Sequence, residues 1–423
     1  MALDDPSCDA TELIDRMAHA GRAAQRELAG MDSSQRARAL TAAATALRDH
    51  AASILAANGE DVAAGEAAGL TPAMLDRLRL DADRLDAIAS AVAAVAALPD
   101  PVGQAISRDV RPNGLVLERV RIPIGLIGII YESRPNVTAD AAALCVRVGN
   151  AALLRGGSEA VRSNRAIHAA MIRGLESAGV PGEAIQLLPT QDRAAVGAML
   201  AAAGLIDMIV PRGGQGLVAR VQADARVPVL AHLDGINHTY IHAAADPAKA
   251  RGIALDAKMR RTGICGAMET LLVDAAFPEA PALVRDLIDA GCAVRGDARA
   301  QAIDPMVTPA DDSDWDTEYL DAILSVAVVD GPDEAMAHIA AHGSHHTDAI
   351  VTEDADVANR FLREVDSAIV MHNASSQFAD GGEFGLGAEI GIATGRLHAR
   401  GPVALEGLTT YKWLVKGTGQ VRG

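Results

Sequence analysis

Aromatic residues and cysteines are scarce in this chain. Phe, Trp and Tyr make up 2% of the 423 residues and there are 4 cysteines, whereas 50% of the residues are hydrophobic. The interior must therefore be packed mainly from Ala, Val, Leu and Ile side chains. The cysteines show no CxxC spacing, so they suggest neither a disulfide framework nor a zinc site.

Long apolar runs are also missing. No run approaches the roughly 20 residues that cross a bilayer, so we expect no membrane partner. The N-terminal stretch MALDDPSCDATELIDRMAHAG is acidic and mixed, and it lacks the basic and apolar parts of a signal peptide. We therefore expect a soluble, cytoplasmic protein.

Positive charge is in deficit. The chain has 38 Lys and Arg residues against 55 Asp and Glu residues, which gives a formal net charge of −17. This balance argues against a nucleic-acid partner, because such a partner requires a basic face. Since the acidity would also repel an anionic substrate at long range, an anion site has to be built locally from a few arginines and backbone amides.

The length favours two or three domains, and the sequence pattern changes from helical to α/β along the chain. We predict helices from Thr11 to Leu98, among them residues 33–59, which have a Ser cap and an Asn-Gly stop. Alternating residues flank Pro112-Asn113-Gly114, which is typical of a hairpin. The extended segment 401–417 could pair with that hairpin.

From Ile124 onward, short apolar strands alternate with helices such as Val161–Ala178, which implies a parallel sheet with helices on both faces. The strands predicted in this series are residues 124–131, 150–156, 184–189, 206–214 and 227–233. A second α/β series begins near Asn237. Its predicted strands are residues 268–274, 322–330, 348–354 and 368–373.

One cysteine has the sequence context of a reactive thiol. Cys265 stands in MRRTGICGAMETLLV, after Arg260 and Arg261 and between two glycines. Glycines let a backbone approach a substrate closely, and nearby cations raise the thiolate fraction of a thiol. The same context also suits a small buried side chain in a turn. The local residues leave both interpretations open.

Two kinds of segment suit anion binding. In IIYESRPNV, polar residues directly follow a predicted buried strand, and open parallel sheets bind ligands at such carboxyl ends. Arg134 could hold an anion there and the Asn136 amide could donate to an oxyanion, or the segment is a Pro-Asn turn with a surface arginine. Arg-Gly-Gly in LLRGGSEAVRSN and in VPRGGQGLVAR lies between a strand and a helix, which favours phosphate. Tight turns explain such glycines equally well.

Other histidines and cysteines could in principle react or bind a metal, but the sequence favours structural roles for them. His345 and His346 are adjacent in GSHHTD and must point different ways, so we expect a solvated turn rather than a metal site. Cys145 lies on an apolar helical face and is expected in the core, while Cys8 and Cys292 have no supporting context. The glycine-rich stretch NASSQFADGGEFGLGAEIGIATGRLHARGP is polar, and irregular segments of this kind are often substrate loops.

Together these segments resemble the glutamate-5-semialdehyde dehydrogenase (γ-glutamyl phosphate reductase) family of the aldehyde dehydrogenase superfamily. The resemblance covers nearly the whole chain. It is carried by IPIGLIGIIYESRPNVTAD, IVPRGGQGL, AKMRRTGICGAMETLLV, TEYLDAIL, NASSQFADGGEFGLGAE and LHARGP. It implies an α/β, aldehyde dehydrogenase-like fold with a Rossmann-like cofactor domain, an α/β catalytic domain and a β-strand oligomerisation arm.

Placed on this sequence, the resemblance implies domain boundaries. The NADPH-binding domain would comprise residues 1–110 and 124–236, the catalytic domain residues 237–400, and the arm residues 111–123 and 401–423. Strand pairing through the arm would give a homodimer or tetramer. An association with glutamate 5-kinase, which would pass on a labile acyl phosphate, is a further hypothesis.

The resemblance also implies roles for single residues. Cys265 matches the nucleophile, and Asn136 matches the amide that stabilises the oxyanion together with the Cys265 backbone N–H. Glu318 aligns with the glutamate that holds the nicotinamide ribose, and Arg155 falls where a cation would suit the 2′-phosphate of NADPH. The cofactor set implied is Arg155, Gly156, Gly213, Gly214 and Glu318. By charge and position, we expect the substrate and its phosphate to contact Arg134, Arg260, Arg261, Asn373, Ser375 and Phe384.

Two positions depart from the superfamily pattern. His232, in AHLDGIN, stands at or beside the glutamate that activates water in hydrolytic aldehyde dehydrogenases. Loss of that carboxylate suits an enzyme that exchanges phosphate, because a water activator would hydrolyse the intermediate. His232 is either a proton shuttle or structural. Asn237 stands where relatives often have cysteine, and we interpret this second position as dispensable to the chemistry.

The activity implied is NADPH-dependent reduction of L-glutamyl 5-phosphate to L-glutamate 5-semialdehyde with release of phosphate, through a thioester on Cys265. This is the second step of proline biosynthesis from glutamate. Two alternatives stay open. One is an acylating, coenzyme-A-dependent member of the same superfamily, and the other is a catalytically silent binding or structural protein that keeps the fold.

Overall fold

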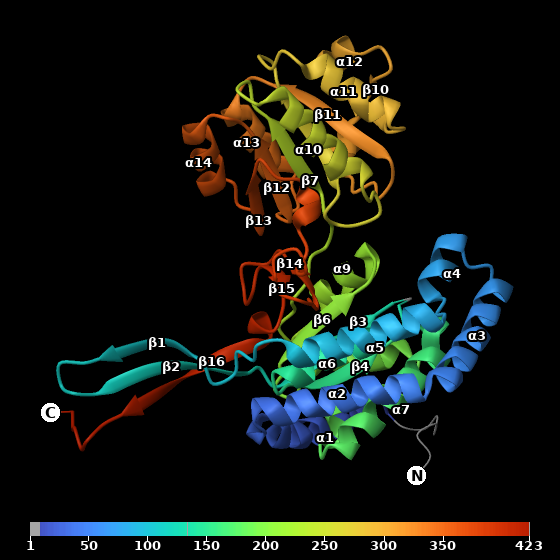
Figure 1. Ribbon diagram of the computed structural model, residues 1–423, viewed down its shortest axis with the longest axis vertical. Coiled ribbons are helices and arrows are strands. Elements are labelled where there is room, and N and C mark those ends of the chain that lie inside the picture. The colour runs from blue at the N-terminus through green and yellow to red at the C-terminus, as the bar shows by residue number, and fades with distance from the viewer. Residues whose placement is uncertain (1–8, 133, 423) are drawn as a thin grey trace. The chain divides into compact units, whose positions relative to one another are not determined.

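The computed structural model describes residues 9–132 and 134–422. The chain divides into two compact units (Figure 1). Unit 1 contains Met1–Ala231, Leu386–Gly391 and Val403–Gly423, and unit 2 contains His232–Gly385 and Ile392–Pro402. Within the described ranges, no helix is both long enough and apolar enough to span a membrane.

Unit 1 begins with the predicted helical region. Its helices are α1 (Ala10–Gly30), α2 (Ser33–Asp49), α3 (Ala51–Ala67), α4 (Pro72–Leu78) and α5 (Ala82–Ala97), which confirms the prediction from Thr11 to Leu98. The helices present Ala and Leu at helical spacing to the interior, for example Leu40, Ala43 and Leu47 of α2, all fully buried.

The predicted ends of the helix in residues 33–59 are wrong. Asp32 rather than Ser33 caps α2, because the Asp32 carboxylate accepts from the Gln35 N–H at 2.8 Å and the Gln35 side chain accepts from the Asp32 N–H. Helix α3 then continues through Asn58-Gly59 instead of stopping there. The Asn58 amide is buried and donates to a carbonyl at the end of α4 and to the Ser163 hydroxyl, so it makes tertiary contacts rather than ending a helix.

A parallel sheet follows, with the strand order β5-β4-β3-β6. It contains β3 (Leu126–Tyr131), β4 (Ala151–Arg155), β5 (Ile185–Leu187) and β6 (Met208–Arg212), which alternate with α6 (Val137–Arg147), α7 (Val161–Ser177), α8 (Arg193–Ala201) and α9 (Gln215–Asp224). The predicted strand 227–233 is wrong, since only Val229 makes a single bridge, to Ile209. Pro228 lacks the N–H that a regular ladder would need.

An antiparallel ribbon completes unit 1. Strand β1 (Ala105–Val110) pairs with β2 (Val116–Pro123), and β2 pairs with β16 (Thr409–Lys416), as labelled in Figure 1. Both the hairpin and its pairing with the C-terminal segment are thereby confirmed. Tyr411, Trp413 and Val415 of β16 are 50%, 54% and 59% exposed. An exposed apolar row of this kind suits a subunit contact.

Unit 2 contains a second parallel sheet, in the order β10-β9-β11-β8-β7-β12-β13. Its strands are β7 (Asn237–Ile241), β8 (Met268–Asp274), β9 (Ala293–Gly296), β10 (Thr308–Pro309), β11 (Ile323–Val329), β12 (Thr347–Val351) and β13 (Ile369–His372). Its helices are α10 (Pro247–Met259), α11 (Ala280–Asp289), α12 (Ala298–Ile303), α13 (Pro332–His342) and α14 (Ala355–Glu364). Short strands β14 (Gly391–Ala393) and β15 (Gly401–Val403) pair with each other.

The strands predicted in residues 268–274, 322–330, 348–354 and 368–373 are present, but β7, β9 and β10 are not among the predicted ones. Strand β7 has the polar sequence NHTYI, yet Asn237, His238 and Thr239 are fully buried. His238 lies 3.0 Å from the carboxylate of Asp348 on β12. Because such partners come only from tertiary structure, no apolar run marks the strand.

Each unit has its own apolar core. In unit 1, Leu126, Leu153 and Met199 belong to one cluster, and in unit 2, Leu271 and Leu283 belong to another. A further cluster of unit 2, which includes Tyr240 and Leu272, packs against Trp315.

The structure describes two cysteines besides Cys265, and both are buried. Cys145 in α6 is fully buried, which confirms its expected place in the core, and burial raises the pKa of its thiol to about 12. Cys292 is also buried. Cys8 lies outside the described residues.

Candidate active site

Cys265 lies in the turn that joins α10 to β8, and its side chain is half-buried. The turn is tied to the neighbouring strand β7, because the amide of Asn237 donates to the carbonyl oxygens of Cys265 and Ala267 at 2.6 and 2.8 Å. The Asn237 oxygen in turn accepts from the Thr347 N–H at the start of β12. One buried amide therefore joins three adjacent strands at the position of the predicted nucleophile.

Gln377 holds the same turn from the segment after β13. Its Nε2 donates to the carbonyl oxygens of Ala257 at 2.9 Å and Arg261 at 3.1 Å. A Cβ on Gly266 would lie 3.3 Å from the carbonyl oxygen of Ser376, so the two segments are in close contact. Gln377 was not singled out from the sequence, although it stands inside the predicted substrate loop.

Glu318 and Gly235 complete the support of the turn. The Glu318 carboxylate accepts from the Gly235 N–H at 3.0 Å, and burial raises the pKa of Glu318. A Cβ at Gly235 would lie 2.2 Å from the carbonyl oxygen of Cys265, so only glycine fits there. Sequence reasoning missed Gly235, since one glycine before an unrecognised strand carries no signal.

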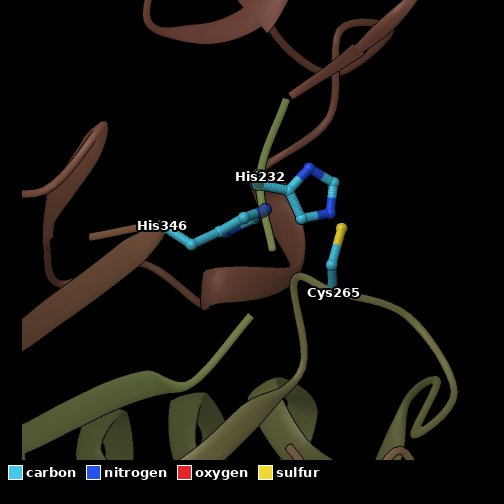
Figure 2. Close-up of side chains that lie close together, drawn as sticks. All are labelled: His232, Cys265 and His346. Atoms are coloured by element: carbon cyan, nitrogen blue, oxygen red, sulfur yellow. The ribbon is translucent and has the colours of Figure 1, made fainter. Parts of the chain in front are cut away.

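Two histidines stand beside the cysteine. Figure 2 shows the sulfur of Cys265 pointing toward the ring of His232, with the ring of His346 next to it. One nitrogen of each ring and the Sγ atom all lie within 4.8 Å of one another. His232 Nδ1 lies 2.8 Å from the carbonyl oxygen of Ile392, and His346 Nδ1 lies 2.9 Å from the Thr347 hydroxyl.

The prediction that His345 and His346 lie in a solvated turn is confirmed for His345 only. His345 is exposed and its Nδ1 lies 2.7 Å from the carbonyl oxygen of Asp366. His346, by contrast, is fully buried at the entrance of β12, so that part of the prediction is wrong. Burial, helped by the nearby His232 ring, lowers the pKa of His346 to about 3, which keeps the imidazole neutral. The side chains of adjacent residues at a strand entrance point to opposite sides, and only one of them reaches the site.

The residues predicted for the substrate are dispersed within unit 2. Arg260 and Arg261 are exposed just before the Cys265 turn. The Asn373 amide donates to the carbonyl oxygen of Thr352, beyond the carboxyl end of β12, rather than reaching the turn. Ser375 is buried and its hydroxyl accepts from the N–H of Gln377, whereas Phe384 is 45% exposed.

In unit 1, Arg134 and Asn136 line a pocket of about 420 Å³ together with residues of α4 and α5. Asn136 precedes α6, and its amide donates to the Asp140 carboxylate at 2.8 Å. Burial raises the pKa of Asp140 to about 6, although the Asn136 hydrogen bond acts in the opposite direction. The amide predicted for an oxyanion is therefore bonded to a carboxyl group of its own helix.

Arg155 ends strand β4 with a partly satisfied guanidinium. Its Nη2 donates to the carbonyl oxygen of Gln191 at 3.2 Å, while its buried Nε has no hydrogen-bond partner in the described part of the chain. Burial lowers the pKa of Arg155, but an arginine stays charged in proteins. A buried charged donor without a partner fits a phosphate oxygen. The adjacent Gly156 has no room for a side chain, because a Cβ would lie 2.2 Å from Nδ2 of Asn164.

Gly213 and Gly214 form the entrance to α9. The Gly214 N–H donates to the carboxylate of Glu132 at 3.0 Å, and a Cβ at Gly213 would lie 2.5 Å from the same carboxylate. Helix N-termini attract anions, and here a side-chain carboxylate takes that position. The turn predicted to bind phosphate thus has the geometry of an anion site, and in this structure the Glu132 carboxylate occupies it.

Comparison with known proteins gives a consistent set of relatives. A sequence model of the aldehyde dehydrogenase family matches residues 5–305. The chain is 75% identical over 413 residues to the gamma-glutamyl phosphate reductase of Novosphingobium aromaticivorans, covering 98% of this chain and 97% of the relative. It is 69% identical over 418 residues to that of Rhizorhabdus wittichii, covering 99% and 97%. The crystal structure of gamma-glutamyl phosphate reductase from Thermotoga maritima has a TM-score of 0.95 at 41% identity, covering 97% of this chain and 100% of that chain.

Proposed function

Because the chain belongs to the aldehyde dehydrogenase family, we propose that it reduces L-glutamyl 5-phosphate to L-glutamate 5-semialdehyde with release of phosphate. This reaction is the second step of proline biosynthesis from glutamate. The observation that carries the proposal is the Cys265 turn, whose backbone is fixed by Asn237, Gln377 and Gly235 while its sulfur stays half-buried. A nucleophile needs this combination of a fixed backbone and an accessible atom.

In the proposed mechanism, the Cys265 sulfur bonds to the γ-acyl carbon as the thiolate. The bond from that carbon to the phosphate oxygen breaks, phosphate leaves with the electron pair, and a thioester remains. The Cys265 backbone N–H and the Asn136 amide donate to the carbonyl oxygen as charge develops on it. Loss of one such donor typically costs about 10²–10³ in rate.

When bound, NADPH would supply the hydride that reduces the thioester carbon. Cys265 then leaves as the thiolate while the aldehyde forms. We assign Arg155 and Gly156 to the adenosine ribose and its 2′-phosphate, Gly213 and Gly214 to the second cofactor loop, and Glu318 to the nicotinamide ribose. The buried donor of Arg155 without a partner supports the preference for NADPH over NADH.

The substrate contacts are proposed from charge and position. We assign the phosphate to Arg134, Arg260 and Arg261, and the amino-acid end to Asn373, Ser375 and Phe384. Asn373 and Ser375 are already bonded within their own loop, so their roles require that loop to change its hydrogen bonds when substrate binds.

The same proposal covers domains and partners. Residues 1–110 and 124–236 would bind NADPH, residues 237–400 would carry out the chemistry, and the strands of 111–123 and 401–423 would form a homodimer or tetramer. The exposed apolar row of β16 supports such an assembly. Association with glutamate 5-kinase and a cytoplasmic place of action belong to this proposal as well.

The test uses the reverse reaction. The purified protein is expected to reduce NADP⁺ with glutamate 5-semialdehyde only when inorganic phosphate is supplied, because phosphate must cleave the thioester. Equal rates without phosphate would contradict the proposal, and a requirement for coenzyme A would favour the acylating alternative. If no acceptor supports turnover although NADPH binds, the catalytically silent alternative is correct.

A further inference from the structure

We propose that His232, Cys265 and His346 form a binding site for a divalent transition-metal ion such as Zn²⁺, and that the bound ion silences the cysteine. Metal binding itself follows from the three side chains in Figure 2. The silencing rests on the proposed role of Cys265 as the nucleophile.

The spacing of the ligand atoms is close to that of a metal site. The Sγ atom and one nitrogen of each imidazole lie within 4.8 Å of one another. A tetrahedral zinc ion, with Zn–S about 2.3 Å and Zn–N about 2.0–2.1 Å, holds such atoms about 3.3–3.6 Å apart. Side-chain rotations that move these atoms by about 1 Å would therefore place all three at bonding distance from one ion.

The hydrogen bonds of the histidines suit metal ligands. His232 Nδ1 lies 2.8 Å from the carbonyl oxygen of Ile392, which fixes the hydrogen on Nδ1 and directs the lone pair of Nε2 outward. A histidine that binds a metal commonly donates its other N–H to a carbonyl in this way. His346 Nδ1 bonds the Thr347 hydroxyl, which leaves Nε2 as the ligand atom.

His346 also has an unmet bonding requirement. The residue is fully buried, and its Nε2 has no hydrogen-bond partner among the residues for which the structure gives positions. Burial of a polar atom without a partner is unfavourable. A metal ion would supply the partner, and a neutral imidazole is the form that binds it.

The backbone makes the arrangement stable. His232 precedes β7, Cys265 precedes β8 and His346 precedes β12, and these strands are neighbours in the order β8-β7-β12. Asn237 bonds the backbone of all three strands together at this edge. Three protein ligands leave a fourth position for water, and the partial exposure of Cys265 and His232 gives an ion access.

The chemistry of binding explains the silencing. The Cys265 thiol loses its proton to solvent, and the sulfur electron pair forms a bond to the ion. That pair can no longer attack an acyl carbon, so metal and acyl substrate exclude each other. A chelator such as EDTA removes the ion and restores the thiol without any change in oxidation state.

The experiment reads the metal directly. Co²⁺ is added to the full chain, and thiolate-to-cobalt charge-transfer absorption in the near ultraviolet is followed with tetrahedral ligand-field bands. We expect saturation at one ion per chain. His346→Asn should weaken Co²⁺ binding by about 100-fold or more, since loss of an outer partner alone costs about 10–100-fold. His232→Ala should do the same, and it serves as the second variant if His346→Asn does not fold.

His345→Asn is the matched control, because that histidine is adjacent but exposed and asparagine tolerates its positive φ of 60°. It should bind Co²⁺ like the unmodified chain. Equal affinity in all the histidine variants, or absorption that persists in Cys265→Ser, would overturn the site. So would Zn²⁺ inhibition of the same strength with and without His346, since the thiol alone would then be the target.

The two proposals fail separately. If Co²⁺ gives the thiolate absorption but Zn²⁺ at saturation leaves turnover unchanged, the silencing is wrong and Cys265 is not the nucleophile. If Cys265→Ser is inactive but the unmodified chain shows no thiolate–cobalt absorption, the metal site is wrong and the proposed reaction stands.

Discussion

The cofactor candidates of unit 1 and the residues around Cys265 in unit 2 lie at opposite ends of the strands of their own sheets. In unit 1, Arg155 and the Gly213-Gly214 turn follow strands β4 and β6, at the carboxyl ends. In unit 2, Cys265 and His346 precede strands β8 and β12, at the amino ends. The usual rule that ligands bind at the carboxyl ends of parallel strands therefore fits the candidates of unit 1 but not Cys265 and His346 in unit 2.

The difference has a cause in the local chemistry. At a carboxyl end, a glycine turn and the following helix N-terminus offer backbone N–H groups, which suit phosphate. At the amino edge of unit 2 the support comes from side chains instead, since Asn237, Gln377 and Glu318 bond the backbone around Cys265. The predicted nucleophile Cys265 is thus positioned by side chains. The comparison predicts different consequences for variants at the two edges.

The largest effect is expected for Cys265→Ser. Serine lacks the nucleophilicity of a thiolate, so we expect turnover to fall by about 10³-fold or more while NADPH still binds. Steady-state rates and fluorescence titration of NADPH measure the two quantities. Cys292→Ala, a buried cysteine of the same unit, is the control and should keep its turnover. Substantial activity in Cys265→Ser would show that Cys265, at the amino ends of the unit 2 strands, is not the nucleophile.

Asn237→Ala should have the next largest effect. It leaves two carbonyl oxygens and the Thr347 N–H without their partner, so the free energy of unfolding should fall by about 2–4 kcal/mol. Displacement of the turn by about 1 Å should lower kcat by up to about 100-fold. Urea unfolding and steady-state kinetics test this.

Thr239→Val on the same strand is the control for Asn237→Ala. The buried Thr239 hydroxyl makes no hydrogen bond to any described residue, so valine should leave stability and kcat nearly unchanged. If both variants behave alike, Asn237 is dispensable, as the sequence suggested.

Arg155→Gln tests the proposed cofactor contact at the carboxyl end of β4 in unit 1. Loss of a charge-assisted hydrogen bond costs about 1.5–3 kcal/mol, so the KM for NADPH should rise by about 10–100-fold while that for NADH changes little. Arg165→Gln is the control, because Arg165 also donates to a backbone carbonyl in unit 1, that of Pro189. Equal changes for both cofactors would mean that Arg155 does not meet the 2′-phosphate.

The last effect concerns stability rather than turnover, through the pH response of Asp140. Its pKa is raised from 3.8 to about 6 by burial, so the folded state binds a proton that the unfolded state has lost between these values. The contribution of Asp140 to stability is thus fully present below about pH 4 and is lost as the pH rises through about 6. Asp140→Asn should remove this pH dependence. The free energy of unfolding of the variant minus that of the unmodified chain should therefore increase from about pH 4 to about pH 7. Urea unfolding at these two pH values measures the difference. A constant difference would contradict the raised pKa.

Much of the fold could be predicted from the sequence. The α/β aldehyde dehydrogenase-like fold is confirmed, as are the hairpin and the apolar strands such as β8 and β11. Strand β7 could not be found, because its buried Asn, His and Thr are satisfied by residues far away in sequence. The end of α3 was misplaced for the same reason, since Asn58 bonds to other helices.

The sequence indicates which residues of the candidate site carry reactive groups, but it does not indicate the side chains that support them. The family resemblance points to Cys265, whose local sequence alone leaves two interpretations open. Nothing in GSHHTD distinguishes the buried His346 from the exposed His345. One of these adjacent side chains is buried and the other is exposed, and the local sequence does not indicate which. Loop composition predicts that Asn373 binds substrate, and this stays a prediction, whereas no sequence signal marks the contact of Gln377 with the Cys265 turn.

The shortage of aromatic residues has a practical consequence. The chain contains 2 tryptophans, and they report on different units, since Trp315 packs against an apolar cluster of unit 2 and Trp413 is 54% exposed on β16. Iodide should quench the emission of Trp413 in an isolated subunit, and burial of the ribbon between subunits should protect it and shift it to shorter wavelength. A Trp413→Phe chain would leave Trp315 as the sole tryptophan, so that assembly and events in unit 2 can be followed separately without any attached dye.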